Sequence, residues 1–243
     1  MRSLAIISRK GGAGKSTLAL NLAVGAHLRG RRVLLADIDP QRSSTEALRN
    51  RRKEGPIVAP STARKLRICL QDAELQRLED VFIDTSAGAE EDRLEAIRLA
   101  DACLLILRPA YLDIIAAAPT VELLRRLQKP TLIMINQAPR RLACSERVEL
   151  IRAMDAIRLF KIPIASEIIR TRRCYQLSPQ LGLSVEELGH DETVQEMARA
   201  YKAVSNFCEK VDRDRRLREA QKRVFTPPII PLAHATYYPP WID

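Results

Sequence analysis

The chain has 243 residues, of which 46% are hydrophobic, and it carries a formal net charge of +10 with an isoelectric point near 9.7. This hydrophobic content is enough for one substantial core, and the lack of any apolar run of about eighteen residues excludes a membrane-spanning helix. The excess of positive charge predicts a polyanionic partner, for which nucleic acid is the best candidate.

The five cysteines are scattered along the chain, without a CxxC pair and without the spacing of metal ligands. The N-terminus leads directly into an apolar run, so it lacks the successive charged, apolar and small-residue regions of a signal peptide. Free thiols in a cytoplasmic protein are therefore expected.

A glycine-rich loop connects the first predicted strand to the first predicted helix. Residues 4–7 form the apolar run of a strand, and residues 18–28 have apolar side chains at helical spacing, ended by Gly30. A phosphate-binding loop needs crowded backbone N–H groups, a lysine and a magnesium-binding hydroxyl, and the intervening segment supplies them in that order. The predicted nucleotide ligands in this loop are Lys10, Gly11, Gly12, Ala13, Gly14, Lys15, Ser16 and Thr17.

The loop departs from the common phosphate-loop pattern at one informative position. Arg9 occupies the place of the first glycine of G-x-x-x-x-G-K-[ST], and Lys10 precedes the glycine pair. KGGxGK[ST] with this early lysine resembles the deviant Walker A loop of the ParA/MinD superfamily of ATPases. The resemblance implies ATP and Mg²⁺ as cofactors and an ATP-sandwich homodimer. In that dimer Lys15 contacts the β- and γ-phosphates, and Lys10 reaches the phosphates bound by the other subunit.

The next apolar strand, VLLADIDP, ends in acidic residues. The order strand, loop, helix, strand predicts an α/β fold with a doubly wound, mostly parallel sheet flanked by helices. Such sheets bind ligands beyond the carboxyl ends of their strands, so we expect Asp37 and Asp39 at the same rim as the phosphate loop. ADIDPQ resembles the second motif of the family, which implies that Asp39 holds the attacking water and that Asp37 lies near the magnesium shell. Arg42 stands where relatives commonly have glycine, so we expect a stiffer loop or a partner contact there.

A third strand, VFIDT at residues 81–85, also ends in an aspartate. This is a Walker B pattern, and beside a phosphate loop it predicts that Asp84 binds Mg²⁺, through water, opposite Ser16. The remaining predicted strands are residues 56–60, 102–109, 131–139 and 162–169, and the remaining predicted helices are residues 43–53, 62–78, 92–99 and 145–160. A further helix is expected after residue 110, with Asp113 as its cap and Pro119 either kinking it or marking its first turn.

Two groups of polar side chains in the second half are candidate ligands. Asn136, within the predicted strand at residues 131–139, sits where relatives often use an asparagine to contact adenine, and a turn asparagine before proline is an equally good interpretation. A basic cluster resembles the region that binds DNA without sequence preference in ParA-type proteins, although arginines also commonly form a solvated face. The candidate DNA-binding residues are Arg140, Arg141, Arg170, Arg172 and Arg173.

Three regions are expected along the chain: an ATPase domain at residues 1–211 that ends in a helix over 193–211, a basic helical extension at 212–224, and a proline- and aromatic-rich tail at 225–243. The extension lacks a continuous apolar face, so it differs from the membrane-targeting helix of MinD. The tail either packs on its own domain or binds another chain.

The motifs together resemble those of small ParA-type partition ATPases. The resemblance implies a weak ATPase that dimerises on ATP, binds DNA non-specifically, associates with the nucleoid and is stimulated by a ParB-like partner. With so few residues before the first strand, we expect no N-terminal DNA-reading domain. Alternatives are an accessory ATPase of conjugative or T-DNA transfer, MinD-like positioning of a protein cargo, and, more distantly, a P-loop metabolic kinase. The iron–sulfur cysteines of the nitrogenase iron protein are missing.

Overall fold

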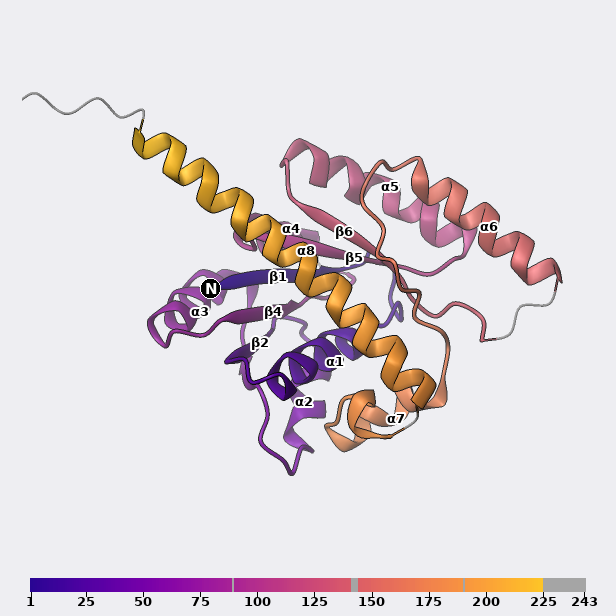
Figure 1. Ribbon diagram of the computed structural model, residues 1–243, viewed down its shortest axis with the longest axis horizontal. Helices are drawn as coiled ribbons and strands as arrows, with labels where there is room; N and C mark the ends of the chain where they lie inside the picture. Colours follow the sequence, from indigo (N-terminus) through magenta and orange to yellow (C-terminus); the bar gives the residue numbers. More distant parts are fainter. Residues whose placement is uncertain (89, 141–143, 190, 225–243) are drawn as a thin grey trace, which may run out of the picture.

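The computed structural model describes residues 1–88, 90–140, 144–189 and 191–224. Within them, six parallel strands form one sheet in the order β3-β2-β4-β1-β5-β6, with helices on both faces (Figure 1). The strands are β1 (Arg2–Ile7), β2 (Val33–Asp37), β3 (Ile57–Pro60), β4 (Asp80–Asp84), β5 (Ala102–Leu107) and β6 (Thr131–Ile135). This confirms the predicted parallel α/β fold.

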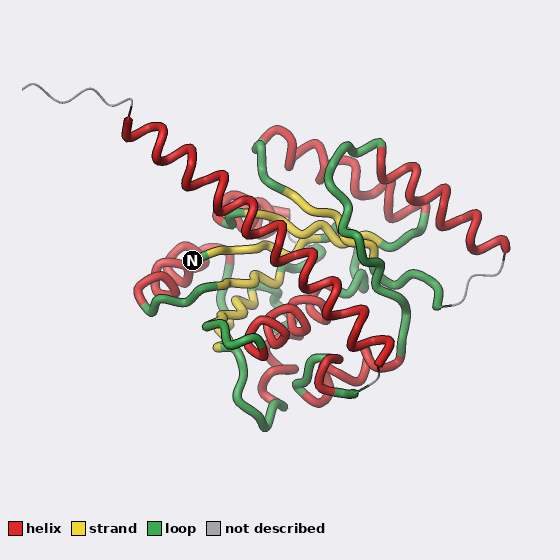
Figure 2. The backbone as a smooth tube through the Cα atoms, in the orientation of Figure 1, coloured by secondary structure: helices red, strands yellow, loops and turns green. Residues whose placement is uncertain are grey.

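The helices form two layers around the sheet, which occupies the middle of the molecule in Figure 2. One layer consists of α1 (Lys15–Leu28), α2 (Ser43–Arg49), α7 (Arg173–Leu181), the 3₁₀ turn η1 (Val185–Glu187) and α8 (Asp191–Val224). The other consists of α3 (Ala63–Leu75), α4 (Glu90–Leu99), α5 (Tyr111–Arg126) and α6 (Cys144–Arg158).

Each central strand sends alternate side chains into two hydrophobic cores. In β1, Leu4 and Ile6 pack with the layer of α1, whereas Ala5 and Ile7 pack with the layer of α3 and α4. Because both faces are covered, the strand sequences are continuous apolar runs and not alternating ones.

The predicted strand at residues 162–169 is wrong. This segment runs beside β6 but makes only two isolated parallel bridges, Ile133 to Ile164 and Ala138 to Arg170. Pro163 has no N–H to donate, and the donors to β6 are four residues apart, at Ala165 (2.7 Å) and Ile169 (2.9 Å), so no regular ladder forms.

The predicted helix at residues 43–53 is shorter than expected and ends at Arg49. Just beyond it, the side chain of Arg51 is almost fully buried, where it forms an ion pair with Glu187 (2.8 Å) and donates to the carbonyl of Gly182 (3.0 Å). These contacts turn the chain toward α7 and η1, because a buried guanidinium needs acceptors that a continued helix would not bring to it.

The cap predicted for α5 is also wrong. Ala110 occupies the N-cap position, and Asp113 lies in the first turn, where its carboxylate accepts from Arg108 (3.1 Å). Pro119 lies in the middle of α5 and not in its first turn.

The terminal helix α8 is continuous through residue 224, so the predicted helix over 193–211 and the basic segment 212–224 form one element. Its C-terminal part extends past the body of the domain (Figure 1). Arg215 anchors it by donating to Asp101, which directly precedes β5 (2.6 Å). None of the helices in the described ranges combines the length and apolar character needed to cross a bilayer.

Candidate nucleotide-binding site

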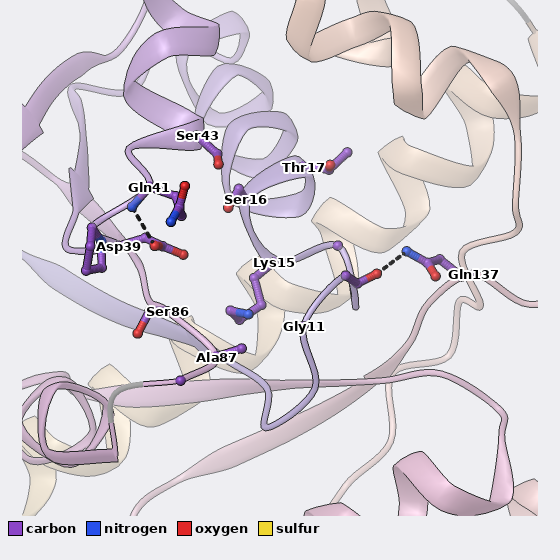
Figure 3. Close-up of a pocket in the computed structure, with 14 residues that line it drawn as sticks. Gly11, Lys15, Ser16, Thr17, Asp39, Gln41, Ser43, Ser86, Ala87 and Gln137 are labelled. Atoms are coloured by element: carbon purple, nitrogen blue, oxygen red, sulfur yellow. Dashed lines mark hydrogen bonds between the residues drawn. The ribbon is translucent and has the colours of Figure 1, made fainter.

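Three loops meet at the carboxyl ends of β1, β2 and β4. In the register of the sheet, Asp84 on β4 lies beside both Ile6 on β1 and Asp37 on β2, so the segments that follow these strands emerge together. They enclose an open cavity of about 670 Å³ (Figure 3). Its lining residues are Gly11, Gly12, Gly14, Lys15, Ser16, Thr17, Asp39, Pro40, Gln41, Ser43, Ser86, Ala87, Gly88 and Gln137.

The glycine loop needs its glycines for both conformation and space. Gly12 and Gly14 have φ values of 70° and 88°, in the left-handed region that side chains disfavour. A Cβ atom on Gly14 would also lie only 2.3 Å from the Asn136 side-chain nitrogen. Gly14 is the N-cap of α1 and provides no capping side chain, so the first N–H groups of α1 are available to an anion.

Asn136 and Gln137 hold this loop from the end of β6. The Asn136 side chain donates from Nδ2 to the carbonyl of Ala13 (2.7 Å), and Gln137 donates from Nε2 to that of Gly12 (2.8 Å), as Figure 3 shows for Gln137. Gln137 was missed by the sequence analysis, because no sequence pattern brings β6 to the loop after β1. A second cavity of about 200 Å³ adjoins the first, sharing Gly14, Thr17 and Gln137 and reaching Tyr175.

Lys15 begins α1 and is buried. Its side chain extends into the space between the glycine loop and the segment of Ser86 and Ala87 (Figure 3). Burial lowers the pKa of Lys15, and the carboxylates of Asp84 and Asp39 partly offset this effect. A lysine in this position is a charged ligand for phosphate oxygens.

Asp84 is fully buried, and neither of its carboxylate oxygens has a hydrogen-bond partner within the part of the chain that the structure describes. Burial raises the pKa of Asp84 from its ordinary value of 3.8 to about 7, and the negative charge of Asp37 contributes in the same direction. A buried carboxylate without donors is suited to bind a cation, either directly or through water.

The residues present fit Mg²⁺. Ser16 lies close enough to Asp84 to lower its pKa, which places a hydroxyl of the cavity wall beside the buried carboxylate. No group of three or more acidic, histidine or cysteine side chains that could bind a metal occurs in the described ranges. Magnesium would therefore be held here by Ser16, Asp84, water and the phosphate groups of a nucleotide, as is usual for this ion.

Asp37 and Asp39 have different surroundings. Asp37 is buried and its Oδ2 accepts from the backbone N–H and the hydroxyl of Thr45 (2.9 and 2.8 Å), while Oδ1 accepts from the N–H of Asp39 (3.1 Å). Asp37 thus lies near Asp84, as the sequence analysis expects, but its direct contacts hold α2 and Asp39 in place. Asp39 lines the cavity and accepts from the N–H of Gln41 (2.9 Å; Figure 3).

Arg42 follows this turn in a left-handed conformation with φ of 54°. Its guanidinium donates to the backbone carbonyl of Asp37. This contact holds the arginine in a backbone conformation that favours glycine, while the stiffer loop or partner contact expected here stays a prediction.

The candidate DNA-binding arginines differ in their contacts. Arg172 forms ion pairs with Glu192 (2.7 Å) and Glu196 (3.5 Å), and Arg170 donates to the carbonyl of Pro139 (2.8 Å). Arg140 and Arg173 are exposed beside a groove of about 440 Å³. Arg141 and the tail at 225–243 lie outside the described residues.

A buried amide joins α1 to the other end of this layer. Asn21 donates from Nδ2 to the carbonyl of Thr17 (2.8 Å) and to the hydroxyl of Ser178 on α7 (3.2 Å). Its Oδ1 accepts from the hydroxyl of Ser184 (3.1 Å) and from the N–H of Val185 (2.8 Å). The helix that carries Lys15 and Ser16 is therefore fixed to α7 and η1.

Comparison with known proteins agrees with this geometry. The family model of the CobQ/CobB/MinD/ParA nucleotide binding domain matches residues 4–231. The chain is 30% identical over 220 residues to a maintenance of carboxysome distribution protein A from Gloeobacter kilaueensis, covering 88% of this chain and 95% of that protein. It is 30% identical over 196 residues to the protein virC1 of Rhizobium rhizogenes, covering 75% of this chain and 82% of that protein.

Two solved structures share the fold. The ATP complex of McdA from Cyanothece has a TM-score of 0.70 at 17% identity, covering 84% of this chain and 96% of McdA. MinD of Pyrococcus horikoshii, complexed with Mg-ADP, has a TM-score of 0.67 at 17% identity, covering 84% of this chain and 95% of MinD. The chain therefore belongs to the CobQ/CobB/MinD/ParA nucleotide-binding family and has the P-loop fold of the ParA and MinD ATPases.

Proposed function

We propose that this protein is a Mg²⁺-dependent ATPase that dimerises on binding ATP and uses the cycle of binding and hydrolysis to position a large cargo. The observation that carries this proposal is the position of Lys10. Lys10 directly precedes Gly11 and Gly12, which line the cavity, yet Lys10 is only partly buried and does not line the cavity of its own subunit. A lysine in that place is available to the phosphates of a second copy.

Within one subunit, the residues divide the work of phosphate binding. The N–H groups of the glycine loop and the ammonium of Lys15 bind the phosphates, while Ser16 and Asp84 hold Mg²⁺. Magnesium, when bound, neutralises the charge on the phosphates. Asp39 lines the cavity and would orient the attacking water, and Asp37 holds Asp39 by accepting its N–H.

The second part of the proposal is DNA binding by the ATP-bound dimer. The net charge of +10 and the exposed side chains of Arg140 and Arg173 support it. Of the remaining candidates, Arg141 stays a prediction, while Arg170 and Arg172 have internal acceptors and would contribute less. Association with the nucleoid in the cytoplasm follows from such binding.

There are three candidates for the cargo. The resemblance to small ParA proteins favours plasmid or chromosomal DNA, brought by a ParB-like partner that stimulates hydrolysis. The similarity to the carboxysome distribution protein over 88% of this chain favours a large protein assembly. The similarity to virC1 favours a DNA-transfer complex.

Light scattering and DNA binding of the full chain test the proposal. With ATP and Mg²⁺ the mass is expected to double, and DNA affinity is expected to exceed that measured with ADP and to fall steeply with salt. A mass that stays monomeric with saturating ATP, or DNA affinity equal in ATP and ADP, would contradict it. Capture of partners by ATP-bound protein then separates a ParB-like protein, an assembly protein and a relaxase as cargo adaptors.

A further inference from the structure

The guanidinium of Arg93 is buried without an ion pair to any carboxylate of the described residues. Arg93 lies in the first turns of α4, and only 4% of its surface is exposed. Its one hydrogen bond to a described residue runs from Nη1 to the carbonyl of Ala87 (3.1 Å), its Nε has no acceptor there, and no described carboxylate lies within ion-pair distance. Burial lowers the pKa of Arg93, the negative charge of Glu90 partly offsets this effect, and the positive charge of Arg9 adds to it.

Such an arrangement is unfavourable unless an anion completes it. Removing a charged group from water is costly, and proteins normally compensate a buried arginine with a carboxylate and several hydrogen bonds. The ion pair of Arg51 with Glu187 in this same chain shows the usual solution. The lack of an equivalent partner at Arg93 therefore requires an explanation.

Arg93 is next to the place where a nucleotide's phosphates would lie. Its acceptor, Ala87, belongs to the segment Ser86 to Gly88 that lines the nucleotide cavity. Arg93 itself does not line the cavity, so the guanidinium contacts this segment from the protein side. It is also close enough to Lys15 for the two positive charges to repel, which contributes to the lowered pKa of Lys15.

We propose that Arg93 is a positioning residue for nucleotide binding, which acts on the terminal phosphate of ATP through the Ser86 to Gly88 segment. This inference rests on the proposed ATPase function. The negative charge of that phosphate compensates the buried guanidinium, and the hydrogen bond to Ala87 makes the position of the Ser86 to Gly88 segment depend on whether the phosphate is present. Arg93 thereby contributes to the preference for ATP over ADP.

Nucleotide affinities of the full chain with Mg²⁺ test this role. The comparison uses ADP and a non-hydrolysable ATP analogue with the wild type, Arg93→Gln, Arg93→Lys and the control Arg98→Gln, which removes an exposed arginine of the same helix. We expect Arg93→Gln to weaken binding of the analogue at least tenfold while ADP affinity changes less than twofold. Arg93→Lys keeps the charge and is expected to be intermediate, and Arg98→Gln is expected to match the wild type.

Urea unfolding without nucleotide separates this role from a structural one. Arg93→Gln removes an uncompensated buried charge and keeps a donor for Ala87, so its unfolding midpoint is expected to equal or exceed that of the wild type. A lower midpoint, or parallel losses of ADP and analogue affinity, would show that Arg93 only braces the fold. Should Arg93→Gln not fold, Arg93→Lys with full analogue affinity would overturn the inference.

The two proposals fail in different ways. A wild-type protein that binds neither nucleotide contradicts the proposed function. A wild-type protein that prefers the analogue, with the same preference in Arg93→Gln, contradicts only the role of Arg93, as does a wild type that binds both nucleotides equally.

Discussion

Asp37 and Asp84 lie opposite each other on adjacent strands of the sheet, and only Asp37 has hydrogen-bond donors among the residues described. Two buried carboxylates at the same level of a sheet thus have separate tasks. Asp37 holds the neighbouring backbone, while Asp84 is left free for a cation. The contrast between them leads to the first prediction.

Replacing Asp84 with asparagine is expected to stabilise the nucleotide-free protein at pH 8 by about 2–4 kcal/mol. The pKa of Asp84 is about 7 in the folded protein against an ordinary 3.8, so the folded state binds more protons between these values. Wild-type stability from this group therefore falls as pH rises from about 4 to about 7, and the variant lacks this slope. Urea unfolding of both proteins at pH 5 and pH 8 measures this difference in the pH dependence of the free energy of unfolding.

The matched control is Asp37→Asn, which removes a carboxylate that accepts from Thr45 and Asp39. It is expected to destabilise the protein at both pH values by about 1–3 kcal/mol. Asp84→Asn should also lose the strengthening of ATP binding by Mg²⁺. Equal stability curves for wild type and Asp84→Asn would contradict the assigned pKa.

Replacing Lys10 with alanine is expected to leave ATP affinity within a few-fold of the wild type, because Lys10 does not line its own subunit's cavity. Hydrolysis and ATP-dependent dimerisation should both be lost. Phosphate release and light scattering measure these effects, with Lys202→Ala, an exposed lysine on α8, as the control. Normal turnover and dimerisation in Lys10→Ala would remove the case for a lysine acting across the interface.

Replacing Asp39 with alanine is expected to reduce hydrolysis by about 10²–10⁴-fold, the usual contribution of a group that positions or activates water. Binding of ATP should persist, so the variant should accumulate as an ATP-bound dimer. Light scattering with saturating ATP would detect it. A monomeric Asp39→Ala under these conditions would disagree with the assigned role.

The arginines after β6 are expected to separate into surface and structural classes. Arg173→Gln should weaken DNA binding for all sequences and reduce the slope of log affinity against log salt by about 1. Arg172→Gln should instead lower stability by about 1–3 kcal/mol, because it leaves the buried Glu196 without its ion pair. DNA titrations at several salt concentrations and urea unfolding of both variants distinguish the classes. The reverse pattern would mean that the ion pairs of Arg172 open on DNA binding.

The sequence predicts the sheet and the meeting of its motifs because these follow from general rules. Continuous apolar runs that end in aspartate are buried parallel strands, and parallel strands present their carboxyl ends at one rim. From those rules alone, Asp39 and Asp84 are expected beside the glycine loop. Residues 162–169 have the composition of a strand, and for that reason their prediction is wrong. Composition does not show whether backbone N–H groups can pair, and here Pro163 and the spacing of the donors to β6 prevent a regular ladder.

Burial of polar side chains is the part that sequence reasoning misses. Nothing in the pattern of α4 distinguishes Arg93 from Arg98, yet one is buried and the other exposed. Likewise, the two contacts from Asn136 and Gln137 to the glycine loop depend on β6 lying near β1 in space, with β5 between them. Such contacts are set by tertiary packing, which a local sequence window does not contain.

The amide of Asn21 limits how the molecule can move during a catalytic cycle. Sliding α1 against α7 would leave the buried donor and acceptor of the Asn21 amide without hydrogen-bond partners, at a cost of about 1–3 kcal/mol for each group. The two helices are thus expected to travel as a single rigid unit. Any movement on nucleotide binding is then expected in the connections after β2 and β4, which line the cavity.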